Sequence, residues 1–253
     1  MRFSPTLPAA ILALAGLLGT AATAADAPEN NAVVPVPKLE NDCYDWWARH
    51  QEVLRIKDRL NPEIVLIGDS ITHFWGGEPE GPVKNGPKAW DDVFGRRKVL
   101  NLGFGWDRTQ NVLWRLDNGE FDGLKPTYVV LNIGTNNFSG TRNARANTPD
   151  EVAEGIRAIC DRIGAKSPRT RIVLMGVFPR GASPQDGYRP KIAALNDRLA
   201  AFAREKGLIF LDLGAKMLGP DGTLSREIMK DFVHPTEKGY ALWAAALKDV
   251  LKE

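Results

Sequence analysis

Five short runs of aliphatic and β-branched residues recur along the chain, separated by stretches with helical periodicity or capping signals. The runs cover residues 64–67, 98–103, 127–134, 171–177 and 208–213. The third run is apolar nearly throughout, as expected for a strand that is covered on both faces. Strand and helix alternate with connections long enough for crossovers, which predicts one parallel sheet with helices on both sides. The sequence therefore predicts an α/β fold with a five-stranded parallel sheet.

Helical segments are expected between these strands and at both ends of the domain. An amphipathic pattern over residues 42–60 ends at Asn61-Pro62, and Thr148 with Pro149 opens a helix that runs to about residue 166. The other expected helices cover residues 107–119, 190–206 and 236–251. Residues 76–88 are rich in Gly and Pro, and we interpret them as a long binding loop beside the site.

Length and charge limit the class of protein. The chain has 253 residues, 43% of them hydrophobic, which suffices for one sizeable core and one catalytic domain over residues 42–253. The formal net charge is +2 and no Lys/Arg block occurs, so neither a nucleic-acid-binding surface nor a polybasic membrane patch is expected. The expected partner is a small molecule.

The N-terminus has the pattern of a targeting segment. One positive charge at Arg2, an apolar core over residues 9–18 and the small residues Ala22-Thr23-Ala24 predict a signal peptide over residues 1–25. An uncleaved membrane anchor is the weaker alternative, because Gly16 and Gly19 interrupt the apolar run. Residues 26–41 lack periodicity and are expected to form an extended leader. The mature protein is thus expected to be periplasmic or secreted, with no membrane contact after cleavage.

Cysteine and histidine content limits redox and metal chemistry. An oxidising compartment permits a disulfide between Cys43 and Cys160, but the sequence leaves open whether their Cα atoms are close enough. Two Cys and three scattered His form no cluster with zinc-ligand spacing. A metal site is therefore not expected.

The first strand ends in Gly68-Asp69-Ser70, which places a hydroxyl at the edge where parallel α/β sheets carry their chemistry. A serine becomes a nucleophile only when an imidazole accepts its proton and a carboxylate orients that imidazole. Asp231 and His234, on a turn before the last helix, supply this pair. His50 lies in a charged helical context and His73 follows the serine too closely. We therefore expect Ser70, His234 and Asp231 to be catalytic.

Acyl transfer also needs hydrogen-bond donors for the oxyanion, each worth about 3 kcal/mol of barrier. Three candidates follow strand ends: the backbone N–H of Gly103, the side-chain amide of Asn136 and the N–H of Ser70 itself. These residues are the predicted oxyanion hole.

Four further residues are weaker candidates for substrate binding. Asp69 and Asn137 lie beside the predicted site, but each is also explained as a residue that shapes or braces a turn. Trp75 and Trp106 are candidates for lining a substrate groove, whereas Trp90 fits such a groove and a core position equally well.

The order of these motifs resembles a known family. Gly68-Asp69-Ser70, Gly103, Gly134-Thr135-Asn136 and Asp231-x-x-His234 resemble the four blocks of the GDSL or SGNH hydrolases. The resemblance implies a flavodoxin-like three-layer α/β/α fold, no cofactor and ester hydrolysis through an acyl-enzyme. Residues 112–116, 118–120, 134–137 and 178–181 are similar to the catalytic subunits of intracellular platelet-activating-factor acetylhydrolase.

The expected function is that of an exported serine esterase, a carboxylic ester hydrolase. Its expected substrate is a short-chain ester, above all an acetyl ester, on an acylated carbohydrate. One alternative is deacetylation of a glycerophospholipid, as the similarity to the acetylhydrolase subunits implies. An alternative of another class is an inactive glycan-binding module. The sequence leaves the oligomeric state open, a homodimer included.

Overall fold

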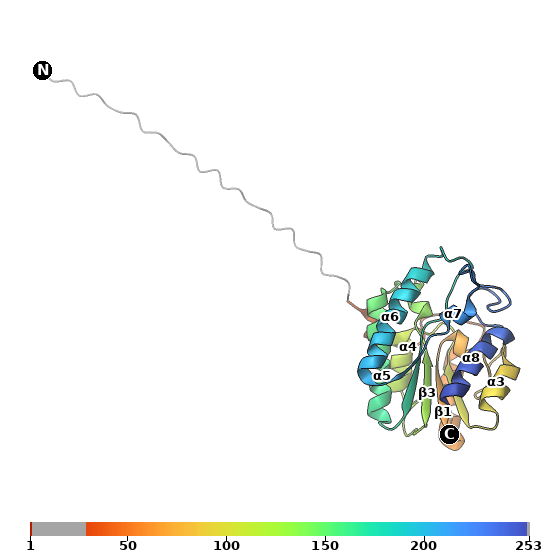
Figure 1. The fold of residues 1–253 in the computed structure, drawn as a ribbon. Coiled ribbons are helices and arrows are strands. Elements are labelled where there is room, and N and C mark those ends of the chain that lie inside the picture. The colour runs from red at the N-terminus through yellow and green to blue at the C-terminus, as the bar shows by residue number, and fades with distance from the viewer. Residues whose placement is uncertain (2–28, 252–253) are drawn as a thin grey trace.

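The computed structural model describes Met1 and residues 29–251. Its centre is a five-stranded parallel sheet with the strand order β2-β1-β3-β4-β5 (Figure 1). The strands are β1 Ile64–Gly68, β2 Val99–Gly103, β3 Tyr128–Asn132, β4 Arg171–Met175 and β5 Ile209–Leu211. Gly68 pairs in register with Gly103 and Asn132, so three strands end side by side at one edge. The α/β fold and the five-stranded parallel sheet are confirmed.

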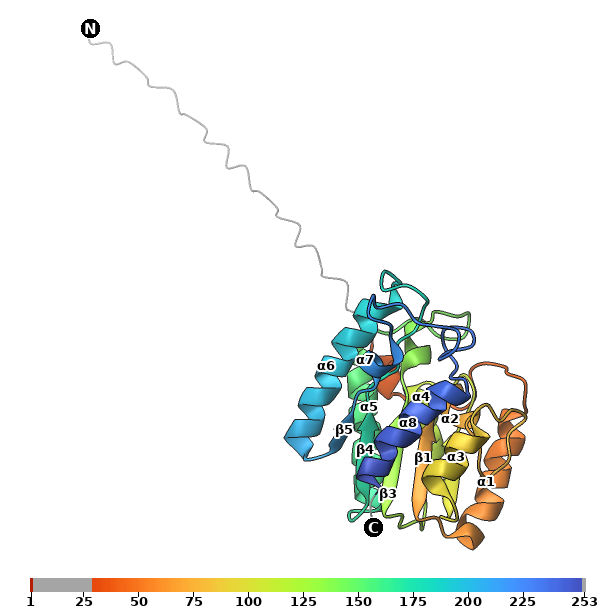
Figure 2. The same ribbon diagram turned by 45° about the vertical axis from the view of Figure 1, so that its right-hand side comes forward.

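Helices cover both faces of the sheet (Figures 1 and 2). One layer contains α1 Trp46–Leu60, α4 Thr109–Asp117, α5 Pro149–Lys166 and α6 Tyr188–Lys206. The other contains α2 Ser70–His73, α3 Pro87–Phe94 and α8 Glu237–Val250. Short elements are η1 Asn31–Val33, η2 Thr135–Phe138 and α7 Gly214–Met217. Along β1, Val65 and Ile67 belong to the first core and Ile64 and Leu66 to the second, as strand periodicity requires.

The segment over residues 76–88, interpreted as a binding loop, packs against β2 and runs into α3. Its last residues begin α3, with Pro87 at the first helical position. Earlier in the segment, the carbonyl of Glu78 accepts a hydrogen bond of 2.7 Å from the N–H of Asn101 on β2. The segment therefore covers the outer edge of the sheet, where unpaired strand groups would otherwise be exposed.

The residues before α1 pack on the domain as far as the structure describes them. Ala32 in η1 is buried, and its carbonyl accepts a hydrogen bond of 2.8 Å from the Thr109 hydroxyl on α4. The N–H of Val36 donates to the carbonyl of Gln110 at 3.2 Å. From residue 29 onward, the expected leader is therefore part of the folded unit, because its few apolar and polar groups find partners on α4 and α5.

Three expectations concern the N-terminus, the membrane and the cysteines. Apart from Met1, the signal peptide predicted over residues 1–25 lies outside the described residues. Within residues 29–251, every helix is too short or too polar to cross a membrane. Cys43 and Cys160 are both free thiols, the first exposed and the second buried.

A buried ionic network joins α1 and α4 to the loop that follows β2. The guanidinium of Arg115 donates to Asp107 Oδ2 at 2.8 Å and to Glu120 Oε2 at 2.7 Å. Trp46 Nε1 donates to Asp107 Oδ1 at 2.8 Å, and His50 Nδ1 lies 2.7 Å from Glu120 Oε1. Burial raises the pKa of Asp107, and the positive charge of the Arg115 guanidinium acts to lower it. The network fixes the loop before α4, because each charge depends on the others for solvation.

The N-terminus of α5 carries the predicted cap. The Thr148 hydroxyl accepts from the N–H of Glu151 at 3.2 Å, and the N–H of Thr148 donates to Glu151 Oε2 at 2.8 Å. Arg145 also binds this carboxylate, with Nη1 2.9 Å from Oε2. The hydrogen bond from Arg145, followed by those from Thr148 and Asn147, lowers the pKa of Glu151 to about 2. The reciprocal pair is a capping box, reinforced by an ion pair.

We expect Arg115→Met to lower the free energy of unfolding by about 3–5 kcal/mol, because two buried carboxylates lose their counter-charge. Chemical denaturation measures the change. The control is Arg162→Met, whose partner Asp117 is exposed, and it should cost less than about 1 kcal/mol. Equal decreases in the free energy of unfolding in the two variants would contradict the prediction that the buried network contributes more than an exposed ion pair.

The cap of α5 predicts a pH dependence of stability. Since the folded pKa of Glu151, about 2, lies below its ordinary value of 4.5, its stabilisation is present above pH 4.5 and disappears as the pH falls through about 2. Glu151→Gln should therefore cost about 1–2 kcal/mol at neutral pH and progressively less toward pH 2. Denaturation of both proteins between pH 7 and pH 2 tests this. A difference between them that does not change with pH would contradict it.

Candidate active site

Ser70 is fixed at the carboxyl end of β1 by a cap. Asp69 Oδ1 accepts from the N–H of Ile71 at 2.9 Å, which starts α2 at Ser70. A Cβ at Gly68 would lie 2.1 Å from Thr72 Oγ1 and 2.4 Å from the carbonyl oxygen of Asn132, so only glycine fits there. The Asp69 carboxyl is wholly buried, and this burial raises its pKa to about 7. Strand, turn and helix together give the Ser70 hydroxyl one position.

The structure brings Ser70, His234 and Asp231 together. Ser70 Oγ lies 2.9 Å from His234 Nε2 although the residues are 164 positions apart. On the other side of the ring, Nδ1 lies 2.7 Å from Asp231 Oδ2. With the proton on Nδ1, the ring donates to the carboxylate and Nε2 accepts from the serine hydroxyl. This is the arrangement in which an imidazole can take a proton from serine.

The turn that carries His234 is built by Asp231 itself. Asp231 Oδ1 accepts from the N–H of Val233 at 3.1 Å and from the N–H of His234 at 2.8 Å. Phe232, inside the turn, has φ of 64°, a left-handed conformation that is rare for a bulky residue. Partial burial acts to raise the pKa of Asp231, but the hydrogen bonds and charge of His234 outweigh it and lower the pKa. The side chain of Asp231 is 48% exposed.

Gly103 differs from its predicted role. Its N–H donates to Asn101 Oδ1 at 2.8 Å, so the amide that the sequence assigned to the oxyanion is already occupied. A Cβ at Gly103 would lie 2.2 Å from the backbone nitrogen of His73. Glycine is therefore required there for the close approach of β2 to α2. The sequence pattern could not separate this packing requirement from a catalytic one.

Trp106, in the loop after β2, has a free amide that sequence reasoning missed. Its φ is 64°, and the N–H of Asp107 donates to the carbonyl of Phe104 at 3.1 Å to close the turn. Within the described residues the N–H groups of Trp106 and Ser70 donate no hydrogen bond. The indole of Trp106 is 38% exposed. The signal in the sequence was a bulky residue between Gly105 and Asp107 in a tight turn.

Asn136 and Asn137 follow β3 and have separate tasks. Asn136 Nδ2 donates to the carbonyl of Asp107 at 3.1 Å, which ties the loops after β2 and β3 together. Asn137 is wholly buried, and its Nδ2 donates to Thr109 Oγ1 at 3.0 Å and to Asn147 Oδ1 at 3.1 Å. Asn137 therefore braces the loop, and its burial excludes the predicted substrate contact.

Burial also rules out two other predicted substrate contacts. Trp75 is completely buried, with its ring 4.5 Å from that of Trp243 and 5.2 Å from that of Tyr240. Trp90 belongs to the same aromatic cluster, 5.9 Å from Trp75. Asp69 is buried as the cap of α2. Trp75 thus anchors α8 against the sheet, because a large apolar ring gains more from the core than from a groove.

The other two histidines have no contact with Ser70 in the structure. His50 is buried against Glu120. His73 is 1% exposed, both of its ring nitrogens lack a hydrogen bond, and burial lowers its pKa to about 2. Across residues 29–251, no group of three or more His, Cys, Asp or Glu side chains is arranged to hold a metal ion.

The chain matches known proteins over most of its length. Residues 66–242 match the model of the GDSL-like lipase/acylhydrolase family. The chain is 34% identical over 226 residues to the human platelet-activating factor acetylhydrolase IB subunit alpha1, covering 88% of this chain and 90% of the relative. The rat subunit alpha2 is 33% identical over 210 residues, covering 82% and 84%.

Solved structures share the fold. A GDSL-like lipase from Bacteroides thetaiotaomicron has a TM-score of 0.63 at 23% identity, covering 79% of this chain and 97% of that one. A catalytic mutant of an acetylxylan esterase from Geobacillus stearothermophilus has a TM-score of 0.60 at 22% identity, covering 76% and 95%. This chain belongs to the GDSL-like lipase/acylhydrolase family, and its activity class is that of a carboxylic ester hydrolase.

Proposed function

We propose that this protein is an exported serine esterase that removes short acyl groups, above all acetyl, from acylated carbohydrate. The observation that carries the proposal is the pair of contacts on His234, 2.9 Å to Ser70 Oγ and 2.7 Å to Asp231 Oδ2. A hydroxyl, an imidazole and a carboxylate in this order are what nucleophilic acyl transfer requires. Periplasmic or secreted localisation is part of the proposal and is supported by the sequence of residues 1–25.

In the proposed reaction, Ser70 Oγ attacks the ester carbonyl carbon while its proton passes to His234 Nε2. Asp231 holds the ring and stabilises the imidazolium. The tetrahedral intermediate collapses, the C–O bond to the alcohol breaks, and the alcohol takes the proton from Nε2. A water molecule then gives a proton to His234 and attacks the acyl-enzyme, which releases the acid and returns the proton to Ser70. Every step is a proton or acyl transfer, so the proposed reaction needs no cofactor.

The oxyanion is proposed to bind three donors, the N–H of Ser70, the N–H of Trp106 and Nδ2 of Asn136. The first two N–H groups donate no hydrogen bond within the described residues, and Asn136 keeps a second amide hydrogen beside its bond to Asp107. Trp106 takes the place predicted for Gly103, whose amide is occupied. The three residues follow β1, β2 and β3, which end at the same edge. Preorganised donors of this kind contribute about 3 kcal/mol each.

Two substrate classes are possible, a carbohydrate ester and an acetyl glycerophospholipid. The small number of exposed apolar side chains favours the carbohydrate ester. The named acetylxylan esterase supports a carbohydrate ester, whereas the named acetylhydrolase subunits support an acetyl glycerophospholipid. In the described chain, large apolar side chains are exposed only at Met1, Val34, Trp47 and Trp106. Trp106 alone follows a strand end at the proposed site, which leaves little apolar surface to dock on lipid. A water-soluble carbohydrate ester therefore fits better.

We expect a fluorophosphonate probe to label the native protein at Ser70, and Ser70→Ala to lose labelling and at least about 10³-fold in kcat/KM for p-nitrophenyl acetate. Peptide mapping by mass spectrometry locates the label. Ser183→Ala, in an outer loop, is the control and should behave like the native protein. A native protein that is neither labelled nor active would support the glycan-binding module instead.

The indole of Trp106 predicts a preference for short acyl chains. Glycine suits φ of 64°, so Trp106→Gly should fold normally and open space beside the proposed oxyanion site. We expect the acetyl-to-hexanoyl ratio of kcat/KM to fall at least about tenfold, a transition-state difference of about 1.4 kcal/mol. p-Nitrophenyl esters, acetylated xylo-oligosaccharide and an acetyl glycerophospholipid form the substrate panel.

Trp47→Ala is the control for this prediction, because Trp47 is an exposed tryptophan on α1. Its acetyl-to-hexanoyl ratio should equal that of the native protein. An unchanged ratio in Trp106→Gly would remove Trp106 from the acyl site. Faster turnover of the phospholipid than of the acetylated oligosaccharide would reverse the order of the two substrate classes.

A further inference from the structure

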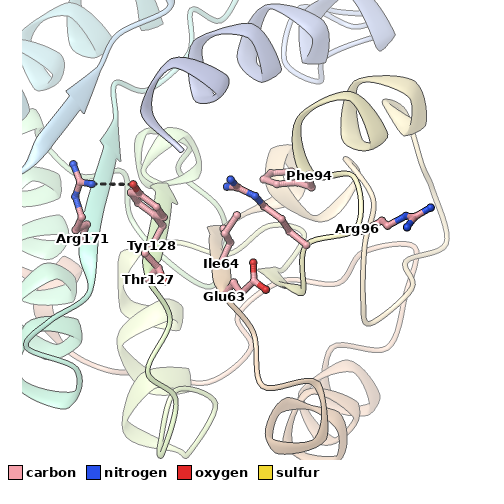
Figure 3. Close-up of a pocket in the computed structure, with 8 residues that line it drawn as sticks. Glu63, Ile64, Phe94, Arg96, Thr127, Tyr128 and Arg171 are labelled. Atoms are coloured by element: carbon pink, nitrogen blue, oxygen red, sulfur yellow. Dashed lines mark hydrogen bonds between the residues drawn. The ribbon is translucent and has the colours of Figure 1, made fainter. Parts of the chain in front are cut away.

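The edge of the sheet opposite Ser70 is hollowed. The amino ends of β1, β3 and β4 lie there, because the strands are parallel and Ser70 follows their carboxyl ends. A cavity of about 740 Å³ opens at this edge (Figure 3). Ile64, Phe94 and Tyr128 line it and are themselves buried in the core. The polar groups around it are Glu63, Thr127 and three arginines, Arg96, Arg97 and Arg171.

Two further hollows continue this cavity along the same edge. The second, of about 480 Å³, shares Arg171 with the first and also contacts Arg169 and Lys206. The third, of about 150 Å³, shares Arg169 with the second and also contacts Lys125. The shared arginines make the three hollows neighbours. Together they extend from β1 past β4 to the end of α6.

Positive charge dominates this surface. We define the basic edge by six residues, Arg96, Arg97, Lys125, Arg169, Arg171 and Lys206. A seventh cation, Lys166, is paired with Asp122, and Glu63 and Asp161 are the only carboxylates that line the three hollows. None of the ion pairs found in residues 29–251 involves Arg96, Arg97 or Arg169. These side chains keep their hydrogen-bond donors for a ligand.

Arg171 is held in place at the centre of the basic edge. Its Nη1 donates to the Tyr128 hydroxyl at 2.9 Å, the contact drawn in Figure 3. The guanidinium also lies over the Tyr128 ring, 5.1 Å from the centroid. A guanidinium fixed in this way loses less conformational entropy when it binds an anion.

The sequence does not show this surface. Its basic residues come from four separate segments, at residues 96–97, 125, 169–171 and 206. The lack of a Lys/Arg block led to the expectation that the protein has neither a nucleic-acid-binding surface nor a polybasic membrane patch. The fold brings these segments together, because each lies at or next to the end of an element at the amino edge of the sheet.

We propose that the basic edge binds an acidic polysaccharide, a glycan with carboxylate groups repeated along the chain. Guanidinium groups bind carboxylates as planar forks. Because an exposed ion pair is worth less than about 1 kcal/mol, a useful affinity requires several contacts made by one ligand. Three adjoining hollows whose cations include Arg96, Arg97 and Arg169, which form no ion pair in the described residues, match a polymer with repeated charges better than a single anion.

The surface favours a glycan over the other polyanions. Membrane docking inserts exposed apolar side chains, and single-stranded nucleic acid stacks its bases on exposed aromatic rings. Phe94 and Tyr128 are 2% and 4% exposed, so the basic edge offers neither. The proposal is independent of the chemistry at Ser70, because the two sites lie at opposite edges of the sheet.

The test measures binding of the full-length mature protein to polygalacturonate by affinity electrophoresis and calorimetry, with neutral galactan as the uncharged control. We expect binding to polygalacturonate that 0.5 M NaCl weakens at least about tenfold, and none to galactan. Inorganic phosphate, duplex DNA and phosphatidylserine vesicles are the competing probes. Tighter binding to DNA or vesicles than to polygalacturonate, or binding that millimolar phosphate abolishes regardless of polymer length, would overturn the proposal.

Matched variants locate the site. Arg96→Glu/Arg97→Glu/Arg171→Glu should weaken polygalacturonate binding at least about tenfold, since three contacts become repulsive. Arg59→Glu/Arg142→Glu/Arg204→Glu changes the net charge equally at exposed positions elsewhere and should bind within about twofold of the native protein. Hydrolysis of p-nitrophenyl acetate should be unchanged in both.

A second variant covers the risk that loss of Arg171 disturbs β4. Arg96→Gln/Arg97→Gln leaves the Arg171–Tyr128 contact intact and should weaken binding at least about threefold, with an unchanged melting temperature. Equal losses in the basic-edge and control variants would show nonspecific attraction and overturn the proposal. A native protein that does not bind polygalacturonate at low salt would do the same.

Discussion

The buried guanidinium of Arg115 is the group on which the geometry of the site depends. It neutralises Asp107 and Glu120 in the buried interior, so the three side chains must stay together or carry an uncompensated charge. Asp107 lies in the loop after β2, and its backbone carbonyl accepts the amide of Asn136. One ionic cluster therefore holds the loops that follow two neighbouring strands. The proposed oxyanion donors keep their positions because the layer beneath them cannot relax without losing that cluster.

Backbone strain occurs in two turns that carry predicted site residues. Three non-glycine residues in the described chain have positive φ, and two of them are Trp106, in the loop after β2, and Phe232, in the turn that carries His234. Bulky side chains in this conformation cost about 1–3 kcal/mol and persist only where the surroundings fix them. Asp107, next to Trp106, is held by Arg115, and Asp231, next to Phe232, binds two backbone N–H groups. Two carboxylates thus hold the two strained turns.

Predictions from the sequence were correct where a residue pattern has a single structural cause. Strand and helix periodicity predicted the sheet, and chemistry at strand ends predicted that His234 reaches Ser70. Predictions failed where two different structural causes give the same residue type in the sequence. Gly103 has no side chain because β2 approaches α2 closely, which looks the same in a sequence as a donor to an oxyanion. A tryptophan such as Trp75 is equally apolar in a core and in a groove. The basic edge is a property of distance in space, which spacing along the chain does not report.

The exposure of Asp231 sets the electrostatic character of the proposed relay. Almost half of its side chain is in water, where the high dielectric constant weakens its field at the imidazole. Water does not weaken the orienting effect of the hydrogen bond, since Oδ2 still fixes the angle of the His234 ring through Nδ1. In the proposed reaction the carboxylate therefore contributes more by orienting the imidazole than by stabilising its positive charge. Because the carboxylate end of this relay is exposed to solvent, dissolved ions can reach it.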